Sequence, residues 1–163
     1  MRYRIALDCD DVLNNLNEMV CKTFNEENGT DITEDTFTSY DIYKCLPFED
    51  AEKYAALWRR EEIWRSLTPI YHSQWGAKKL VDDGFDVFIT TATHWENFPW
   101  KVKWLKRYFP FIDESHIICI RDKSILDVDV MIDDNLDNLI GNIRCNRVVL
   151  EKPWNKNVHD EAY

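Results

Sequence analysis

The chain has 163 residues, of which 45% are hydrophobic and 13% aromatic, and its formal net charge is −10. This length fits one domain with a small insertion, and the apolar share is sufficient for a buried core. The acidic balance argues against binding to a nucleic-acid polymer, which needs a basic surface, and no apolar run approaches the about 20 residues of a membrane span.

The N-terminal part of the chain begins with one predicted strand and one predicted helix. Arg4–Asp8 is short and apolar, as is typical of a buried strand. Apolar residues at helical spacing predict a helix from Val12 to Asn28, with Gly29 as its C-cap. Residues 30–68 are rich in aromatic residues, lack a strand pattern, and contain a helical stretch around Asp50–Ile63.

Helix and strand patterns alternate over the rest of the chain. A helix is predicted from Ser73 to Asp83, where Gly84 ends it. Another has Pro99 in its first turn and runs to about Tyr108, and a further one begins near Leu136. The remaining predicted strands are Phe85–Ile89, His116–Ile120, Val128–Ile132 and Arg147–Leu150.

This alternation predicts an α/β fold with parallel βαβ units and right-handed crossovers. We expect residues 1–14 and 70–163 to form a Rossmann-like parallel-sheet core. Residues 15–69 would form a small helical cap inserted after the first strand. Ligands of such sheets bind beyond the carboxyl ends of the strands.

Polar side chains gather at these strand ends. They are Asp8 and Asp10, Thr90 and Thr91, Lys123, and Asp133 and Asp134. Each group alone is typical of a turn, a helix cap or a surface position. Their coincidence at the ends of separate apolar strands, in this order, indicates a functional site.

The chemistry of this set points to phosphoryl transfer. Clustered carboxylates repel one another, and a divalent cation such as Mg²⁺, which prefers oxygen ligands, offsets that repulsion. One carboxylate can attack phosphorus and form an aspartyl-phosphate, while a second, two residues on, serves as general acid and base. A threonine hydroxyl and a lysine ammonium would hold the phosphate oxygens.

The ordered motifs Asp8-x-Asp10-x-Val12, Thr91, Lys123 and Asp133-Asp134 resemble those of haloacid dehalogenase-like phosphatases. The resemblance implies Asp8 as the nucleophile and Asp10 as the general acid and base. It implies Thr91 and Lys123 as phosphate ligands, with Thr90 as the alternative by one residue. Mg²⁺ would be held by Asp8, the backbone carbonyl of Asp10, and one or both of Asp133 and Asp134.

Longer stretches are similar to the 5'(3')-deoxyribonucleotidase family. They are Phe88–Thr91, Ile120–Ser124, Met131–Asp134 and Lys152–Asn155. The chain departs from this family at Asp11, where relatives commonly have glycine, and at Ala92-Thr93-His94, where they often have serine and then a basic residue. These departures leave the core chemistry intact and bear on the choice of substrate.

The resemblance implies a deoxyribonucleoside monophosphate as substrate. Tyr43 and Trp58, among the aromatic residues of the insertion, are candidates to stack on its base, and His94, just after the second motif, is a candidate contact to the leaving group. Two alternatives stay open. A phosphatase of the same mechanism could act on another small metabolite such as a sugar phosphate, and a non-enzymatic, receiver-like phosphoacceptor module also combines aspartates, threonine and lysine. Lys123 precedes the second acidic pair, which disfavours the receiver order.

Five scattered cysteines without a C-x-x-C pair favour reduced thiols and a cytoplasmic protein. The short apolar stretch near the N-terminus is not typical of an export signal. We therefore expect a small phosphomonoester as partner, with no membrane and no nucleic-acid polymer, and we leave a homodimer open.

Overall fold

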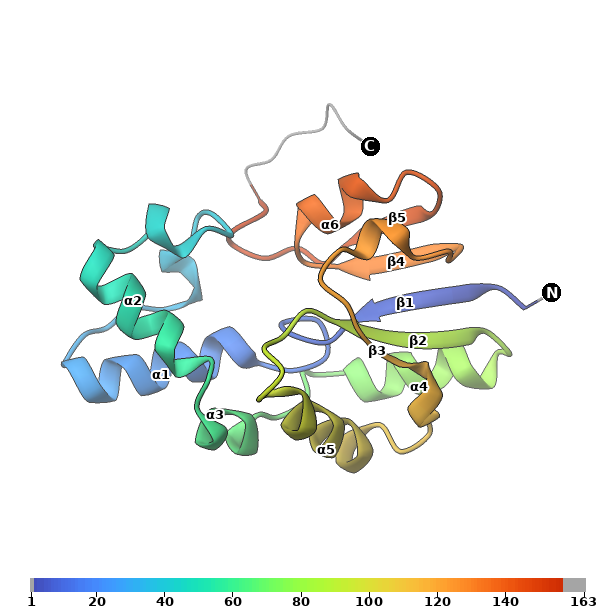
Figure 1. Cartoon of the computed structure of the whole chain (residues 1–163), viewed down its shortest axis with the longest axis horizontal. Coiled ribbons are helices and arrows are strands. Elements are labelled where there is room, and N and C mark those ends of the chain that lie inside the picture. The colour runs from blue at the N-terminus through green and yellow to red at the C-terminus, as the bar shows by residue number, and fades with distance from the viewer. Residues whose placement is uncertain (1, 157–163) are drawn as a thin grey trace.

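Five parallel strands form one sheet in a computed structural model of the chain, which describes residues 2–156 (Figure 1). The strand order is β3-β2-β1-β4-β5, with the N-terminal strand in the middle. The strands are β1 (Arg4–Asp8), β2 (Asp86–Thr91), β3 (Ile117–Cys119), β4 (Val130–Asp133) and β5 (Asn146–Val149). Each predicted strand is present within two residues of its predicted bounds, and the α/β fold is confirmed.

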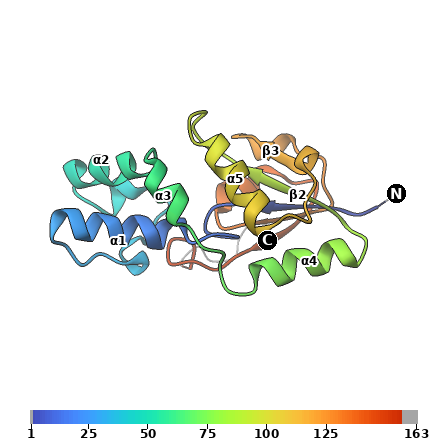
Figure 2. The same cartoon turned by 90° about the horizontal axis from the view of Figure 1, so that it is seen from below.

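Helices connect the strands and pack on the sheet. They are α4 (Ser73–Asp82), α5 (Phe98–Tyr108) and α6 (Leu136–Gly141). Figure 2 shows α4 and α5 along one face of the sheet, and α6 packs against β4 and β5. The connection from β3 to β4 contains only a 3-10 turn, η4 (Lys123–Ile125), and η3 (Glu114–His116) precedes β3.

The elements between β1 and α4 lie together beyond the carboxyl ends of the strands, and we call them the cap (Figures 1 and 2). They are α1 (Leu16–Asn28), η1 (Glu34–Thr36), η2 (Ile42–Lys44), α2 (Phe48–Leu57) and α3 (Glu61–Ser66). α1 contacts α2 and α3, and α3 contacts α5 of the core. This placement sets the cap opposite the strand ends that carry the polar residues.

The first cap helix begins at Leu16, four residues after the predicted start at Val12. Asp11 has a positive φ of 57°, which interrupts any helix at that point. The first N–H groups of α1 are then satisfied by side chains, because Asn14 Oδ1 accepts from Leu16 N at 3.1 Å and Asp11 Oδ1 accepts from Asn17 N at 2.8 Å. The predicted C-cap is confirmed at Gly29, whose φ is 66°.

The single helical stretch predicted around Asp50–Ile63 is two helices, α2 and α3. The break follows Trp58, whose carbonyl oxygen accepts hydrogen bonds from Trp64 Nε1 at 3.0 Å and Asn97 Nδ2 at 2.7 Å. These side chains take the place of the next helical N–H groups. The hydrogen bond from Asn97 of the core to the Trp58 carbonyl thus accounts for the end of α2 at this point.

The main core cluster runs without interruption from the sheet into the cap. The two chain segments that join cap and core are paired, since Asn15 N donates to Thr68 O at 3.2 Å and Thr68 N donates to Asn15 Oδ1 at 2.8 Å. Trp104 Nε1 of α5 donates to Leu67 O at 3.0 Å. These contacts fix the cap over the strand ends.

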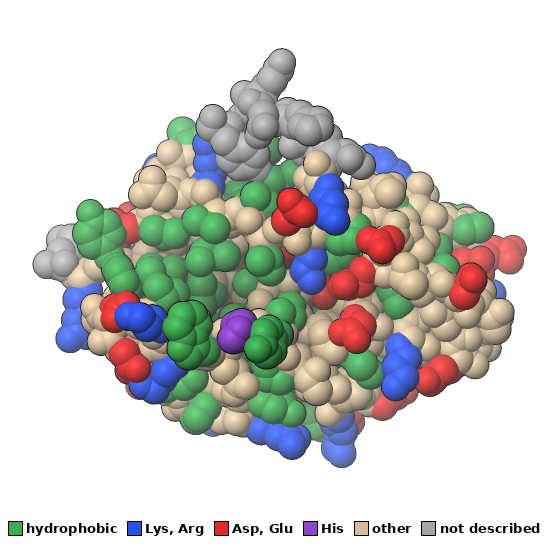
Figure 3. Space-filling view, turned by 180° about the vertical axis from the view of Figure 1, so that it is seen from behind, with side chains coloured by type: hydrophobic (Ala, Val, Ile, Leu, Met, Phe, Trp, Pro, Cys, Tyr) green, Lys and Arg blue, Asp and Glu red, His purple; other side chains and the backbone are tan. Residues whose placement is uncertain are grey.

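The outer surface is unevenly apolar. Hydrophobic side chains gather on one half of the reverse face (Figure 3). Among residues 2–156, every helix is too short or too polar to span a bilayer.

Candidate active site

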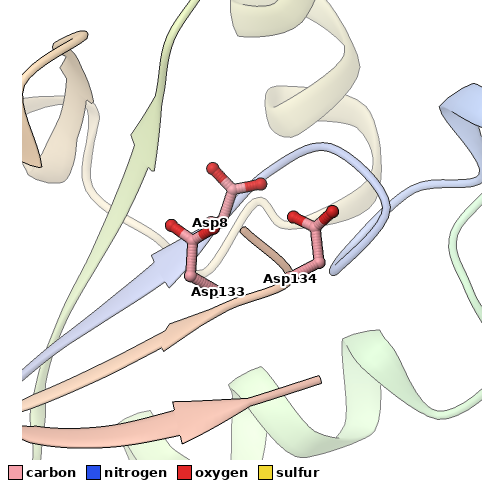
Figure 4. Close-up of side chains that lie close together, drawn as sticks. All are labelled: Asp8, Asp133 and Asp134. Carbon is pink, nitrogen blue, oxygen red and sulfur yellow. The ribbon is translucent and has the colours of Figure 1, made fainter. Parts of the chain in front are cut away.

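Three carboxylates meet at the ends of two neighbouring strands. β1 and β4 pair through Leu7 and Ile132, so the following residues, Asp8 and Asp133, lie side by side, and Asp134 comes next. Their side chains project to the same side of the strand ends (Figure 4), and one oxygen from each lies within 4.8 Å of the others. All three are buried.

Lys123 lies among these carboxylates. Its ammonium donates to Asp8 Oδ1 and, at 2.6 Å, to Asp133 Oδ2. Burial lowers the pKa of Lys123, but the two carboxylates outweigh it and hold that pKa above its ordinary value. The lysine is therefore charged and compensates part of the negative charge.

One ammonium does not balance three carboxylates. Burial raises the pKa of Asp8 to about 7, against the lowering effect of Lys123, and the nearby Asp133 and Asp10 raise it further. Burial, with Asp8 and Asp11 nearby, likewise raises the pKa of Asp134 well above its ordinary value. An all-oxygen cluster whose carboxylates resist ionisation is the donor set that fits a divalent cation such as Mg²⁺.

Asp10 is held at both carboxylate oxygens. Asn14 Nδ2 donates to Oδ1 at 3.0 Å, and Lys101 Nζ donates to Oδ2. Lys101 belongs to α5, is 1% exposed, and lies 4.9 Å from the centre of the Trp64 ring of the cap. The general acid predicted from the sequence is thus fixed in orientation by Asn14 and by Lys101, which lies beneath Trp64 of the cap.

The two strand-end threonines differ in what their hydroxyl groups contact. Thr90 donates to the carbonyl oxygen of Leu7 at 3.4 Å, which ties it to the sheet. Thr91 Oγ1 accepts from Lys101, the lysine that also holds Asp10. That contact leaves the Thr91 hydroxyl hydrogen available, but both threonines are buried, so the choice between them as phosphate ligand stays a prediction.

A cavity of about 420 Å³ lies between the strand ends and the cap. Its floor holds the acidic cluster together with Lys123, Lys101 and Arg121. Its cap side is aromatic, formed by Phe37, Tyr40, Trp58 and Trp64.

The predicted substrate contacts divide into two groups. Trp58 and His94 line the cavity. Tyr43 is 47% exposed on the cap surface, where its hydroxyl donates to Glu52. Tyr43, Thr90 and Thr91 are not among the described residues that line the cavity.

Two residues of the C-terminal segment contact Asp134, although the sequence predicts no role for either in the site. Trp154 donates from Nε1 to Asp134 Oδ2 at 2.9 Å. Asn155 Nδ2 donates to the carbonyl oxygen of Asp134 at 2.9 Å. The C-terminal segment therefore holds the Asp134 side chain in place within the acidic cluster. This contact joins residues that are 20 positions apart and is visible only in the folded chain.

Comparison with known proteins identifies the family. The model of the family described as 5' nucleotidase, deoxy (pyrimidine), cytosolic type C protein matches residues 2–163. The chain belongs to this family. A 5'(3')-deoxyribonucleotidase of Bacillus subtilis is 29% identical over 158 residues, which cover 96% of the chain and 90% of the relative. One of Clostridium acetobutylicum is 27% identical over 152 residues, covering 93% and 83%.

Solved structures show the same fold. A HAD hydrolase of Bacillus subtilis bound to magnesium has a TM-score of 0.58 at 13% identity, covering 98% of this chain and 90% of its own. A HAD family hydrolase of Deinococcus radiodurans with bound phosphate and sodium has a TM-score of 0.58 at 11% identity, covering 91% and 79%. The fold is therefore haloacid dehalogenase-like. Membership in the nucleotidase family shows that the chain is a phosphomonoester hydrolase, which excludes the non-enzymatic, receiver-like alternative.

Asp11 stands where the resemblance to the nucleotidase family predicts glycine. Its φ of 57° is the conformation that glycine adopts freely, and its carboxylate caps α1 through Asn17 N. Burial raises the pKa of Asp11 to about 8, although the Asn17 N–H and Lys152 lower it. The side chain thus replaces glycine at a cost in backbone strain and provides a helix cap.

We expect Asp11→Asn to stabilise the protein increasingly as pH rises. The pKa of Asp11 is higher in the folded than in the unfolded chain, so the folded state binds more protons and loses stability between about pH 4 and about pH 8. Asparagine keeps the acceptor for Asn17 and tolerates positive φ. In urea unfolding with EDTA present, the free energy of unfolding of the variant relative to wild type should rise by about 2 kcal/mol or more between pH 5 and pH 8.5. A difference independent of pH would contradict this assignment.

Proposed function

We propose that this enzyme is a Mg²⁺-dependent 5'(3')-deoxyribonucleotidase that hydrolyses deoxyribonucleoside monophosphates through an aspartyl-phosphate on Asp8. The observation that carries the proposal is the acidic cluster of Asp8, Asp133 and Asp134 with Lys123, set beneath an aromatic cap. The relatives named as 5'(3')-deoxyribonucleotidases, which align over nearly all of the chain, support the substrate class.

The acidic cluster fits Mg²⁺, since all its donors are carboxylate oxygens and their raised pKa values favour a neutralising cation. Asp8, the backbone carbonyl of Asp10, and Asp133 or Asp134 would hold the ion. When bound, Mg²⁺ lowers the repulsion between the phosphate and the carboxylates and neutralises charge that develops on the phosphoryl oxygens.

The residues of the chain supply the bond-making steps. A carboxylate oxygen of Asp8 attacks phosphorus as the bond from phosphorus to the ester oxygen breaks, and Asp10 gives its proton to the departing alkoxide. Asp10 then takes a proton from water, whose oxygen attacks phosphorus and displaces the Asp8 carboxylate. Inorganic phosphate leaves, and both aspartates return to their starting states.

Three further side chains support these steps. Lys123 and Thr91 would bind non-bridging phosphate oxygens, and the contact of Lys123 with Asp8 aligns the nucleophile. Lys101 keeps Asp10 oriented toward the leaving group through its bond to Oδ2. The aromatic cap side of the cavity supplies flat apolar surface for a nucleobase.

The proposal is tested by phosphate release from a panel of deoxynucleoside and ribonucleoside monophosphates and sugar phosphates, each with Mg²⁺ and with EDTA. We expect Mg²⁺-dependent release that is fastest from deoxynucleotides. Release from sugar phosphates alone would keep the mechanism and remove the nucleotidase assignment. Equal rates in EDTA would contradict the metal dependence.

We expect Trp154→Phe to weaken Mg²⁺ binding by about 10–100-fold, because partners that orient a metal ligand contribute on this scale. Phenylalanine fills much of the indole volume and removes the donor to Asp134 Oδ2. Isothermal titration calorimetry with Mg²⁺ measures the change. Trp75→Phe, at an exposed tryptophan outside the cavity, is the matched control. An unchanged affinity in Trp154→Phe would show that Asp134 does not depend on this bond.

A further inference from the structure

Asn17 is a polar residue of the cavity that the proposed chemistry does not use. It lies in the first turn of α1, lines the cavity and is 8% exposed. Its backbone N–H donates to Asp11, so its main chain is tied to the loop that follows the nucleophile. The position is therefore fixed relative to the reacting groups.

The orientation of the Asn17 amide is set from inside the cap. The hydroxyl of Tyr54 donates to Asn17 Oδ1, and Cys21 Sγ lies 3.3 Å from that hydroxyl. Tyr54 is fully buried, and its ring packs against Phe24 and Phe37 at centre distances of 5.7 and 4.9 Å. A well-packed tyrosine that donates to Oδ1 leaves the Nδ2 group of the amide on the opposite side.

That Nδ2 group is not fully enclosed by protein, and Asn17 lines the cavity. Within residues 2–156 it has no hydrogen-bond partner, although every fully buried side-chain nitrogen and oxygen of those residues has one. The group is therefore reachable from the cavity that Asn17 lines. The group can therefore donate to water or to a ligand that enters the cavity.

We propose that Asn17 is a specificity-determining residue that donates a hydrogen bond to the alcohol portion of the substrate. The inference rests on the proposed function. The strand-end carboxylates and Lys123 line the part of the cavity where the phosphate would bind, whereas Asn17 belongs to α1 of the cap, toward which the alcohol portion would extend.

The chemistry of the donor defines the substrate class. An amide N–H is neutral and suits a neutral acceptor, such as a carbonyl oxygen, a ring nitrogen or a sugar oxygen. Five aspartates line the cavity against Lys101, Lys123 and Arg121, so a second anionic group on the substrate would be repelled. The site thus selects phosphomonoesters whose alcohol portion is neutral and carries a hydrogen-bond acceptor.

The test compares kcat/KM for deoxyuridine 5'-monophosphate with that for phenyl phosphate, whose leaving group lacks such an acceptor. In Asn17→Asp the oxygen that accepts from Tyr54 is kept and the donor is replaced by an acceptor. We expect the ratio of the two kcat/KM values to fall by about 10–100-fold. Both substrates carry the same phosphate, so the effect of the added charge on phosphate binding cancels in the ratio.

Tyr54→Phe is the second variant, because Tyr54 is a positioning residue that does not line the cavity. It frees the Asn17 amide to rotate and should lower the ratio by a smaller factor, which keeps the test decisive if Asn17→Asp does not fold. Asn28→Asp, the same substitution at the far end of α1, is the control and should leave the ratio unchanged.

An unchanged ratio in both variants would overturn the inference, as would a parallel loss on both substrates. The proposed function fails in a different way, through wild-type enzyme that releases phosphate from neither substrate.

Discussion

Asp8→Asn is expected to lower turnover by at least about 10⁴-fold, the scale on which loss of a covalent nucleophile acts. The amide has nearly the same size as the carboxylate but cannot attack phosphorus. The fold should persist, because the substitution removes a buried charge from a crowded acidic cluster and Asp133 remains to pair with Lys123. Phosphate release and urea unfolding, measured on the same preparation, check both parts.

Asp127→Asn is the matched control for Asp8→Asn. Asp127 is an exposed carboxylate that pairs with Arg4 at 2.8 Å and lies outside the cavity. The Asp127→Asn variant should have the same activity as wild type. If Asp8→Asn retained activity near that of the control, Asp8 would not be the nucleophile and the covalent mechanism would be wrong.

Asp10→Asn is expected to lower kcat for nucleotide substrates by about 10²–10⁴-fold, the usual contribution of a general acid and base. The loss should depend on the leaving group. An alkoxide needs the proton that Asp10 supplies, whereas p-nitrophenolate leaves without it. With p-nitrophenyl phosphate, the variant should therefore release about one equivalent of nitrophenolate quickly and then turn over slowly, because Asp10 no longer activates water.

Stopped-flow absorbance with p-nitrophenyl phosphate distinguishes the two roles of Asp10. A burst followed by slow turnover places Asp10 in the hydrolysis of the phosphoenzyme as well as in its formation. Uniformly slow release without a burst, at a rate equal for both kinds of leaving group, would mean that Asp10 only shapes the site and that another group moves the proton.

The parts of the fold that depend on local pattern are predictable from the sequence. Apolar runs define the five strands, and Gly29 ends α1 as expected, since it adopts the left-handed conformation. The residues that end β1 and β4 are predictable as a site for the same reason, because parallel strands deliver their carboxyl ends to one edge.

The features that the sequence does not reveal depend on contacts between distant segments. Lys101 has the pattern of an ordinary lysine on an amphipathic helix, and only the packing of α5 beneath Trp64 buries it against Asp10. From the sequence, Asn17 is an ordinary polar residue of a cap helix. Only the fold brings Tyr54, 37 residues later, close enough to fix its amide. Tyr43 is an aromatic residue like Trp58, yet its 3-10 turn places it on the outer surface.

The central claim, that Asp8 carries the phosphoryl group, is tested most directly by trapping the phosphoenzyme. Wild-type enzyme is mixed with deoxyuridine 5'-monophosphate and Mg²⁺, quenched in acid within a single turnover, and digested for mass spectrometry. We predict that the peptide containing Asp8 gains one phosphoryl group, that borohydride reduces this residue, and that EDTA or Asp8→Asn abolishes the signal. Rapid substrate turnover without phosphorylation of that peptide would contradict the covalent mechanism.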